Sequence, residues 1–395
     1  MSGREAVIVD VVRTAFGKRN GALSGWHPAD LLGFTLKSIV ERNGVDPELI
    51  DDVVCGCVTQ TGEQGCNVAR NAVVAGGLPW TVPATTVDRQ CGSSQQAMHF
   101  VAASVMSGMY DLAVACGVES MSRAPMASNA KGGTGPFPPS YLEAIDGRLW
   151  MQFRVAQVLA DEHGITREEM DAYSLESHRR AAEATRSGHF TKEILPVPVK
   201  AEDGSLTGEV LSADEGIRFD ASAEALASLP PAQSWEPETA PDITAGNSSQ
   251  MTDGASAMIV AERSFAEKLG LPVRARFSAF AVGAEDAVLV LSAPNRVTRK
   301  LFERTGMKVG ELDAIECNEA FAAIALRWAR EFKPDPAVFN PRGGAIAIGH
   351  PLGATGVRMT ATLLNQLEST GGRFGLQTMC EGGGQANCTV IERLG

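Results

Sequence analysis

One αβ pattern occurs twice along this 395-residue chain, at positions 262 residues apart. In residues 40–55 and again in residues 302–317, a helical stretch ends at a glycine, a short loop follows, and an apolar strand comes next. Glycine often ends helices because it adopts the left-handed conformation without steric cost. Chance could produce this order, but one constant offset without a gap favours duplication, which predicts two similar α/β halves packed together. The matched residues are Glu41 and Glu303, Gly44 and Gly306, Asp51 and Asp313, and Cys55 and Cys317.

A loop-rich block separates the two repeats. Residues 112–118 are nearly all apolar, as expected for a strand in a sheet that is covered on both faces. The alternation of strands and helices then stops at a Gly- and Pro-rich loop, residues 131–139, and at Pro-rich stretches in 195–198 and 230–231. Regular patterning resumes near Asp253. The predicted fold class is therefore α/β with an inserted middle domain.

The net charge limits the partners of the chain. Thirty-five Lys and Arg against 47 Asp and Glu give −12 at pH 7, which is not the footprint of a protein that binds nucleic acid or an anionic membrane. The longest apolar runs fall far short of the roughly 20 residues that span a bilayer. The first ten residues, with Arg4 and Glu5 beside a short apolar strand, show no signal-peptide pattern. We expect a cytoplasmic protein with no nucleic-acid and no membrane partner.

The cysteine pattern favours free thiols. Eight cysteines in a large cytoplasmic chain are more often thiols than disulfides. Cys55, Cys57 and Cys66 form a C-x-C…C cluster, but the second matching pair that a structural metal site needs is missing. We therefore expect no bound metal.

Cys91 stands where a strand-like run gives way to a helix, whose spacing is marked by Ala97, Val101 and Val105. Backbone N–H groups and the positive end of the helix dipole at such a position favour the thiolate form. The position predicts a lowered pKa and a nucleophilic thiol, with a small buried cysteine as the structural alternative.

Three other segments carry candidate groups. The glycine-rich residues 340–356 hold His350 at a turn, where its ring could accept a proton from a thiol or could be purely structural. Cys380 precedes three glycines, whose N–H groups can form an oxyanion hole or simply a tight turn. Asn318 and Glu319 leave an apolar strand, where α/β sheets present functional side chains.

Together these segments resemble the thiolases, the acetyl-CoA acyltransferases, over essentially the full chain. The resemblance implies a thiolase-like fold with duplicated α/β halves in a five-layered α-β-α-β-α core. It implies an N-terminal half of residues 1–123 plus 250–272, a loop domain of residues 124–249 that covers coenzyme A, and a C-terminal half of residues 273–395. The motifs that carry it are Cys91-Gly-Ser-Ser, Gly117-Val-Glu-Ser-Met-Ser122, Asn318-Glu-Ala-Phe-Ala, Gly349-His-Pro-Leu-Gly-Ala-Thr-Gly and Cys380-x-Gly-Gly-Gly-Gln.

The resemblance also implies a reaction and its residues. Thiolytic cleavage of a 3-oxoacyl-CoA gives acetyl-CoA and a shortened acyl-CoA through an acyl-cysteine on Cys91. His350 would accept the Cys91 proton, and Cys380 would exchange a proton with the α-carbon of acetyl-CoA. Asn318 would hold a water that binds the thioester oxygen together with His350. The N–H groups of Cys91 and Gly382 would bind the other oxyanion.

The same resemblance suggests the substrate contacts and the assembly. Acyl-CoA and coenzyme A are then substrates, no cofactor is needed, and a homodimer or homotetramer is expected. The implied contacts of coenzyme A and the acyl chain are Arg218, Ala245, Ser249, Ala320, Phe321 and Met151. A solvated surface charge is the alternative for Arg218.

Several positions depart from the family pattern near the expected acyl and pantetheine sites. Asp88 replaces a common Asn, Glu381 a common apolar residue and Ala386 a common Gly. Residues 149–154 and 292–295 also differ from the usual runs. These departures favour a degradative thiolase for an acyl group bulkier than acetoacetyl, with acetoacetyl-CoA as a further substrate.

Two other functions were weighed against acyl transfer. A decarboxylating 3-oxoacyl synthase of the wider superfamily would carry a His or Asn in place of Cys380. A lipid-binding or scaffold protein with the same fold would have lost a catalytic residue, whereas all four are present: Cys91, Asn318, His350 and Cys380.

Overall fold

A computed structural model describes residues 3–232 and 237–395 of the chain. The strands are β1 (Ala6–Thr14), β2 (Gly17–Lys18), β3 (Val53–Gly56), β4 (Ala84–Val87), β5 (Leu112–Ser120), β6 (Ile194–Leu195), β7 (Val197–Lys200), β8 (Leu206–Leu211), β9 (Thr252–Glu262), β10 (Ala275–Ala284), β11 (Ala314–Cys317), β12 (Phe374–Glu381) and β13 (Gln385–Arg393). The helices are α1 (Pro28–Asn43), α2 (Val68–Ala75), α3 (Ser93–Ser107), α4 (Pro139–Ala144), α5 (Gln152–Glu162), α6 (Arg167–Arg186), α7 (Ala223–Ala227), α8 (Arg263–Lys268), α9 (Ala293–Thr305), α10 (Ala322–Phe332), α11 (Ala345–Ile348) and α12 (Thr355–Thr370).

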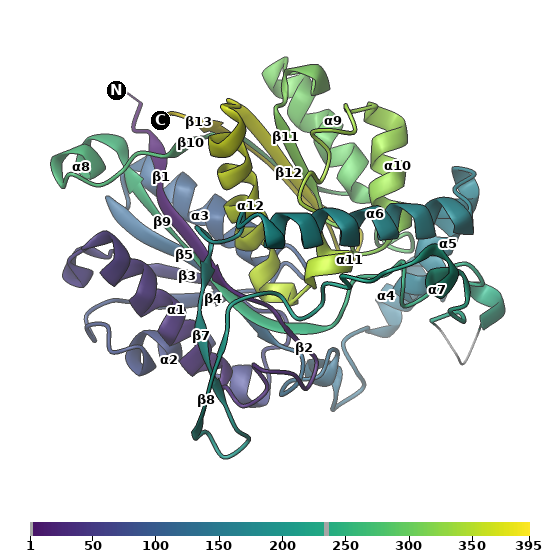
Figure 1. The fold of residues 1–395 in the computed structure, drawn as a ribbon, viewed down its shortest axis with the longest axis horizontal. Helices are drawn as coiled ribbons and strands as arrows, with labels where there is room; N and C mark the ends of the chain where they lie inside the picture. The colour runs from purple at the N-terminus through teal and green to yellow at the C-terminus, as the bar shows by residue number, and fades with distance from the viewer. Residues whose placement is uncertain (1–2, 233–236) are drawn as a thin grey trace.

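A mixed sheet runs through the molecule in the order β11-β12-β13-β10-β1-β9-β5-β3-β4 (Figure 1). Strands β10 to β13 form a C-terminal half-sheet, and β1, β3, β4, β5 and β9 form an N-terminal half-sheet. The half-sheets meet at β1 and β10, where Val7 lies opposite Arg276 and Ile8 lies opposite Ala275. This short antiparallel junction joins two units that each have their own parallel and antiparallel pairs.

Helices and half-sheets stack in five layers. The helices α1 and α2 cover the outer face of the N-terminal half-sheet, and α9 and α10 cover the outer face of the C-terminal one. Between the half-sheets lie α3 and α12, which pack on the inner faces of both (Figure 1). Side chains alternate accordingly along β1, because Val7 and Val9 belong to the outer core and Ala6 and Ile8 to the inner one. The predicted five-layered, duplicated α/β fold is confirmed.

The repeat seen in the sequence is a structural duplication that reaches beyond the two matched segments. The helices α1 and α9 both end at left-handed glycines, Gly44 with φ 61° and Gly306 with φ 74°. At the same offset of 262 residues, α3 begins at Ser93 and α12 at Thr355. Each half therefore contributes one of the two central helices.

The middle segment, residues 124–249, is built differently from the two halves. It holds α4 to α7 and a β7–β8 hairpin that projects from the molecule (Figure 1). The helix α6 begins with a capping box between Thr166 and Glu169. The domain boundaries at 123/124 and 249/250 stay a prediction.

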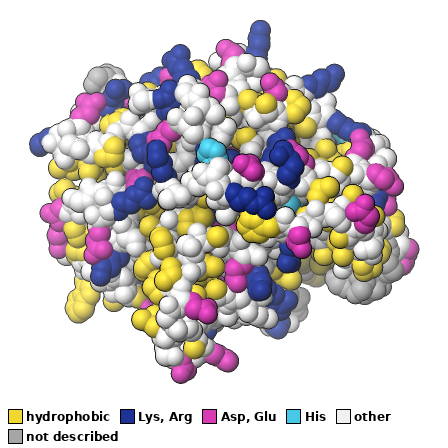
Figure 2. All heavy atoms as spheres, viewed as in Figure 1, with side chains coloured by type: hydrophobic (Ala, Val, Ile, Leu, Met, Phe, Trp, Pro, Cys, Tyr) yellow, Lys and Arg dark blue, Asp and Glu magenta, His cyan; other side chains and the backbone are white. Residues whose placement is uncertain are grey.

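On the face shown in Figure 2, Lys and Arg side chains are interspersed with Asp and Glu side chains. Within residues 3–232 and 237–395, no helix has both the length and the apolar character that a membrane crossing requires.

Candidate active site

Cys91 occupies the loop between β4 and α3, two residues before the helix begins. Its side chain is 5% exposed and packs in a small cluster with Val58, Met121, Leu352, Met359 and Met379. The pKa of Cys91 is raised to about 12, first by burial and then by the charge of Glu381. The N–H groups of Cys91 and Gly382 act in the opposite direction.

The predicted lowering of the pKa of Cys91 is therefore wrong for the resting protein. The backbone donors are present, but removing the thiolate from water costs more than they return. In this environment Cys91 is a thiol at neutral pH, and an attack needs a base beside it. The two donors that oppose the shift lie where an oxyanion on a Cys91-bound group would form.

His350 lies between Gly349 and α12, and it is held in one tautomer. The Thr355 hydroxyl donates to Pro351 O at 2.9 Å, and the His350 Nδ1 lies 2.7 Å from the same Thr355 Oγ1. Since the hydroxyl proton is already used, Nδ1 carries the ring proton and donates, which leaves the lone pair on Nε2. Burial and the charge of Arg358 lower the pKa of His350 to about 3. The ring is thus a neutral base.

Asn318 follows β11 and touches the basic nitrogen of His350. Its Nδ2 lies 3.4 Å from His350 Nε2, and its backbone N–H donates to Thr378 O at 3.0 Å, next to the end of β12. Among the described residues, Asn318 Oδ1 is buried without a hydrogen-bond partner. An unused acceptor beside the imidazole fits the expected role of holding a water.

Cys380 lies at the end of β12, completely buried. Burial raises the pKa of its thiol well above the ordinary value, and Cys91 contributes the largest charge effect. The two cysteines therefore lie within electrostatic reach of each other. The structure places Asn318 next to His350, and it places Cys91 near both Gly382 and Cys380.

The predicted coenzyme A contacts fall into two groups. Ala320 and Phe321 are buried in the same apolar cluster as Cys380, and Ser249 donates its backbone N–H to Ala320 O at 2.9 Å. Their placement beside Cys380 fits a channel that leads to the thiols. Arg218, Ala245 and Met151 are exposed instead, on the middle segment, at 52% for Met151.

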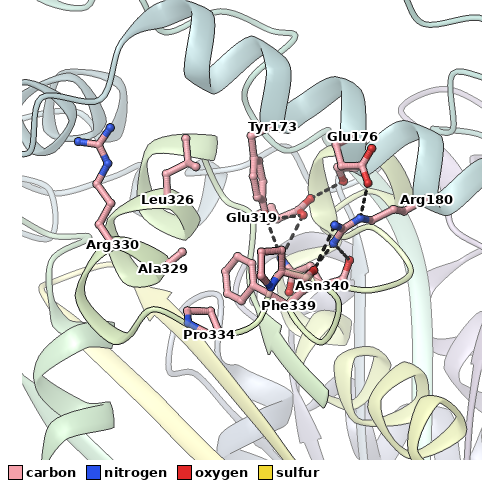
Figure 3. A pocket seen from close by; sticks show the side chains of 12 residues that line it. Tyr173, Glu176, Arg180, Glu319, Leu326, Ala329, Arg330, Pro334, Phe339 and Asn340 are labelled. Carbon is pink, nitrogen blue, oxygen red and sulfur yellow. Dashed lines mark hydrogen bonds and ion pairs between the residues drawn. The ribbon is translucent and has the colours of Figure 1, made fainter. Parts of the chain in front are cut away.

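Glu319, the second residue of the Asn318 motif, holds the loop after β11 in place through hydrogen bonds that the sequence did not predict. Its carboxylate accepts hydrogen bonds from Tyr173 Oη at 2.8 Å, Ser177 Oγ at 2.7 Å and Asn340 Nδ2 at 3.0 Å. Figure 3 shows Tyr173 and Asn340 converging on it beside a cavity of about 340 Å³. Because these donors come from α6 and from the loop before α11, Glu319 fixes the loop that presents Asn318.

Thr355, the residue that orients His350, was also missed. It lies five residues after the histidine at the first position of a helix, and this spacing was the available signal.

The three cysteines of the C-x-C…C cluster differ in their exposure, because Cys55 and Cys57 are buried and Cys66 is exposed. Within the described part of the chain, no group of three or more His, Cys, Asp or Glu side chains could hold a metal.

Comparison with known proteins agrees with this geometry. A family model described as thiolase, N-terminal domain matches residues 6–264, and one described as thiolase, C-terminal domain matches residues 271–393. A steroid 3-ketoacyl-CoA thiolase FadA6 of Mycobacterium tuberculosis is 45% identical over 99% of this chain and 94% of its own length. The 3-ketoacyl-CoA thiolases of Shewanella baltica and Aliivibrio fischeri are 42% and 40% identical over 99% of this chain and all of theirs.

Both family models together cover nearly the whole chain, and the relatives align from end to end. The chain belongs to the thiolase family and is an acyltransferase that cleaves 3-oxoacyl-CoA thiolytically.

Proposed function

We propose that Cys91, His350, Cys380, Asn318 and the N–H of Gly382 carry the thiolytic reaction of this enzyme. The observation that supports the proposal is the hydrogen-bonded set around His350, because it holds a neutral base next to Asn318. Coenzyme A takes part as a substrate, so the reaction needs no resident cofactor.

In the first half-reaction His350 Nε2 takes the proton of Cys91, and the sulfur attacks the 3-oxo carbon of the substrate. The resulting oxyanion accepts from the N–H groups of Cys91 and Gly382. The bond between carbons 2 and 3 then breaks, and its electron pair stays on carbon 2. Cys380 donates a proton to that carbon, and acetyl-CoA leaves while the shortened acyl group stays on Cys91.

In the second half-reaction coenzyme A replaces Cys91 as the thiol on the acyl group. The Cys380 thiolate takes the proton of the incoming thiol, the new thioester forms, and the Cys91 sulfur leaves. The proton on His350 returns to Cys91, so both cysteines end as thiols. Asn318, whose Oδ1 has no partner among the described residues, holds the water that donates to the thioester oxygen during carbon–carbon cleavage.

A substrate larger than acetoacetyl-CoA is the second part of the proposal. Glu381 and Ala386 replace a common apolar residue and a common Gly next to Cys380, and residues 292–295 depart from the usual run. The name of the FadA6 relative also points to bulky acyl groups. Rates with a panel of 3-oxoacyl-CoAs of increasing bulk test this. A strong preference for acetoacetyl-CoA over all longer and branched substrates would overturn it.

The assembly and the location of the enzyme are proposals as well. We infer a homodimer or homotetramer in the cytoplasm, in keeping with the family and with β4, an incompletely buried strand at the edge of the sheet. Sedimentation equilibrium of the purified enzyme tests the oligomer, and a monomer at micromolar concentration would contradict it.

Acetyl transfer to the nucleophile tests the catalytic assignment. After incubation with acetyl-CoA and digestion, the peptide that contains Cys91 should carry one acetyl group in the wild type and none in Cys91→Ser. Cys380→Ser should still acetylate Cys91 but should not turn over, because the proton for the α-carbon is missing. An unmodified Cys91 in folded wild-type enzyme, or normal turnover of Cys380→Ser, would refute the assignment.

A further inference from the structure

Glu381 is a buried acid that the reaction above does not use. It lies between Cys380 and Gly382, and its side chain is fully buried. A Cβ atom placed on Gly92 would lie 1.8 Å from Glu381 Oε1, so the carboxyl group packs directly on the backbone one residue after Cys91. Met379, which points to the same face of β12, belongs to the buried cluster around Cys91.

The duplication supplies an internal comparison for this residue. Glu119 is the penultimate residue of β5 and Glu381 the last residue of β12, and the two lie 262 residues apart, the offset of the repeat. The carboxylate of Glu119 faces the start of α12 and accepts from the N–H groups of Val58, Thr59 and Gly353 at 3.0, 3.0 and 2.9 Å. Gln64 Nε2 adds a fourth bond at 2.8 Å. This is a carboxylate held by a complete set of donors.

Glu381 occupies the equivalent place without those donors. Among the described residues, neither of its oxygens has a hydrogen-bond partner. Arg89, whose charge acts on Glu381, donates from Nη1 to Gln385 at 2.8 Å, and its Nε is buried without a partner in the described part of the chain. A buried carboxylate without donors is costly, whereas a carboxylic acid is not charged and brings a donor of its own.

Asn387 is a neighbouring side chain with an acceptor that is not in use among the described residues. Asn387 lies on the same face of the β12–β13 pair, diagonal to Glu381, and its Nδ2 contacts Gly92 O at 3.5 Å. Its Oδ1 is buried without a partner among the described residues. A proton on Glu381 therefore suits its surroundings, whereas the four donors around Glu119 lower the pKa of that carboxyl group against the rise that its burial causes.

We propose that Glu381 is a positioning residue for the nucleophile: its un-ionised carboxyl group packs against the start of α3, and its ionisation opposes negative charge at Cys91. The inference rests on Cys91 being the nucleophile. The titratable or charged groups within electrostatic reach of Glu381 are Cys91, Cys380, Asp88 and Arg89, while β13 contributes the amides of Gln385 and Asn387 on the same face.

The electrostatic consequence concerns the reacting sulfur and the oxyanion. Burial raises the pKa of Glu381 well above its ordinary value, Arg89 opposes this rise, and Asp88 adds to it. When Glu381 ionises, its charge raises the pKa of Cys91 and repels an oxyanion at the N–H of Gly382, the next residue. At alkaline pH a smaller fraction of Cys91 is therefore thiolate than there would be without the charge on Glu381.

The test is the pH profile of alkylation at Cys91, followed by the mass of its peptide after timed exposure to iodoacetamide. The variant Glu381→Gln keeps the shape of the neutral acid and cannot ionise. Its alkylation rate, relative to that of the wild type, should rise about tenfold between neutral and alkaline pH, the change that one pKa unit produces. A constant ratio across the pH range would overturn the proposal.

Two further variants keep the test decisive. Burial is the main cause of the raised pKa of Glu381, and Asp88→Asn removes a charge that adds to it. In this variant Glu381 should ionise at lower pH, so the alkaline slowing of Cys91 alkylation should also begin at lower pH, even if Glu381→Gln does not fold. An alkylation profile that does not move would contradict the proposal.

Glu119→Gln, the matched change in the other half, should instead destabilise the fold. A pH effect on Cys91 equal to that of Glu381→Gln would refute the proposed difference between Glu381 and Glu119. Acetylation of wild-type Cys91 at neutral pH tests the catalytic assignment separately.

Discussion

At the scale of single residues, burial decides the chemistry of this site. The thiols of Cys91 and Cys380 are harder to ionise than free cysteine, and His350 is harder to protonate than free histidine. In the proposed mechanism a neutral imidazole takes the proton of a neutral thiol only when the substrate accepts the sulfur. The resting enzyme thus avoids a permanently reactive thiolate.

The hydroxyl of Thr355 should matter because it fixes which nitrogen of His350 is basic. Thr355→Val keeps the shape but removes the oxygen that accepts from Nδ1, so we expect kcat to fall by about tenfold to a hundredfold with little change in KM. Thr355→Ser, which keeps Oγ, should retain most of the activity. Steady-state kinetics of both variants check this, and equal activity of Thr355→Val and wild type would contradict the assigned tautomer.

His99 predicts a loss of stability in acid. Burial and the charge of Arg89 lower its pKa to about 3, from 6.5 for the unperturbed side chain. Between these values the unfolded chain binds a proton that the folded protein excludes, so the free energy of unfolding falls as the pH falls through this window. Each such histidine contributes about 1.4 kcal/mol per pH unit. Urea denaturation of His99→Gln should show a shallower pH slope, and an unchanged slope would refute the prediction.

At the scale of elements, close backbone contacts seat the catalytic loops. Gly353, just before α12, lies against the backbone near the carboxyl ends of β3 and β5. A Cβ atom on Gly353 would lie 2.4 Å from Val118 O and 2.6 Å from Gly56 O. On the other side, a Cβ on Gly117 would lie 2.1 Å from Gly353 O. Since backbone atoms cannot swing aside, only glycines let the His350 loop reach the half that carries Cys91.

Gly353→Ala should therefore separate the two loops. We expect a loss of about 1–3 kcal/mol in the free energy of unfolding and a lower kcat, because the methyl group overpacks against two carbonyls. Gly310→Ala is the matched control, since a Cβ there meets nothing within 4 Å. Thermal unfolding and kinetics measure both, and equal stability of the two variants would contradict the close packing.

At the scale of the whole molecule, a buried cluster of charges ties the middle segment to the core. Arg13 on β1 donates to Glu193 Oε1 at 2.8 Å and to both oxygens of Asp214, at 2.6 and 2.9 Å. All three side chains are buried. Glu193 and Asp214 belong to the segment that also carries Arg218 and Ser249, so this cluster fixes the predicted coenzyme A surface relative to the thiols.

Removing the cation should release that segment. Arg13→Met leaves two carboxylates unpaired in the interior, which costs about 3–5 kcal/mol. We expect lower stability in urea and faster proteolysis within residues 124–249. Lys37→Met, which breaks an exposed pair with Glu41, should change the stability by less than about 1 kcal/mol. Similar losses in both variants would rule out a special role for the buried cluster.

Much of this protein could be predicted from the sequence because its information is local or periodic. The constant offset between Gly44 and Gly306 predicted the duplication, since a helix that ends at a left-handed glycine depends on a few neighbouring residues. The motifs around Cys91, His350 and Cys380 predicted the family and its reacting groups. Neither inference needed a contact between distant residues.

Only the tertiary structure decided the charge states and the supports of the site. The sequence predicted an activated Cys91 thiolate, but burial by five apolar neighbours from distant segments reversed the sign of its pKa shift. The difference between Glu119, with four donors, and Glu381, with none among the described residues, is likewise invisible in two glutamates at equivalent positions. Desolvation and hydrogen bonding depend on what surrounds a group in space, and the chain order alone does not specify those surroundings.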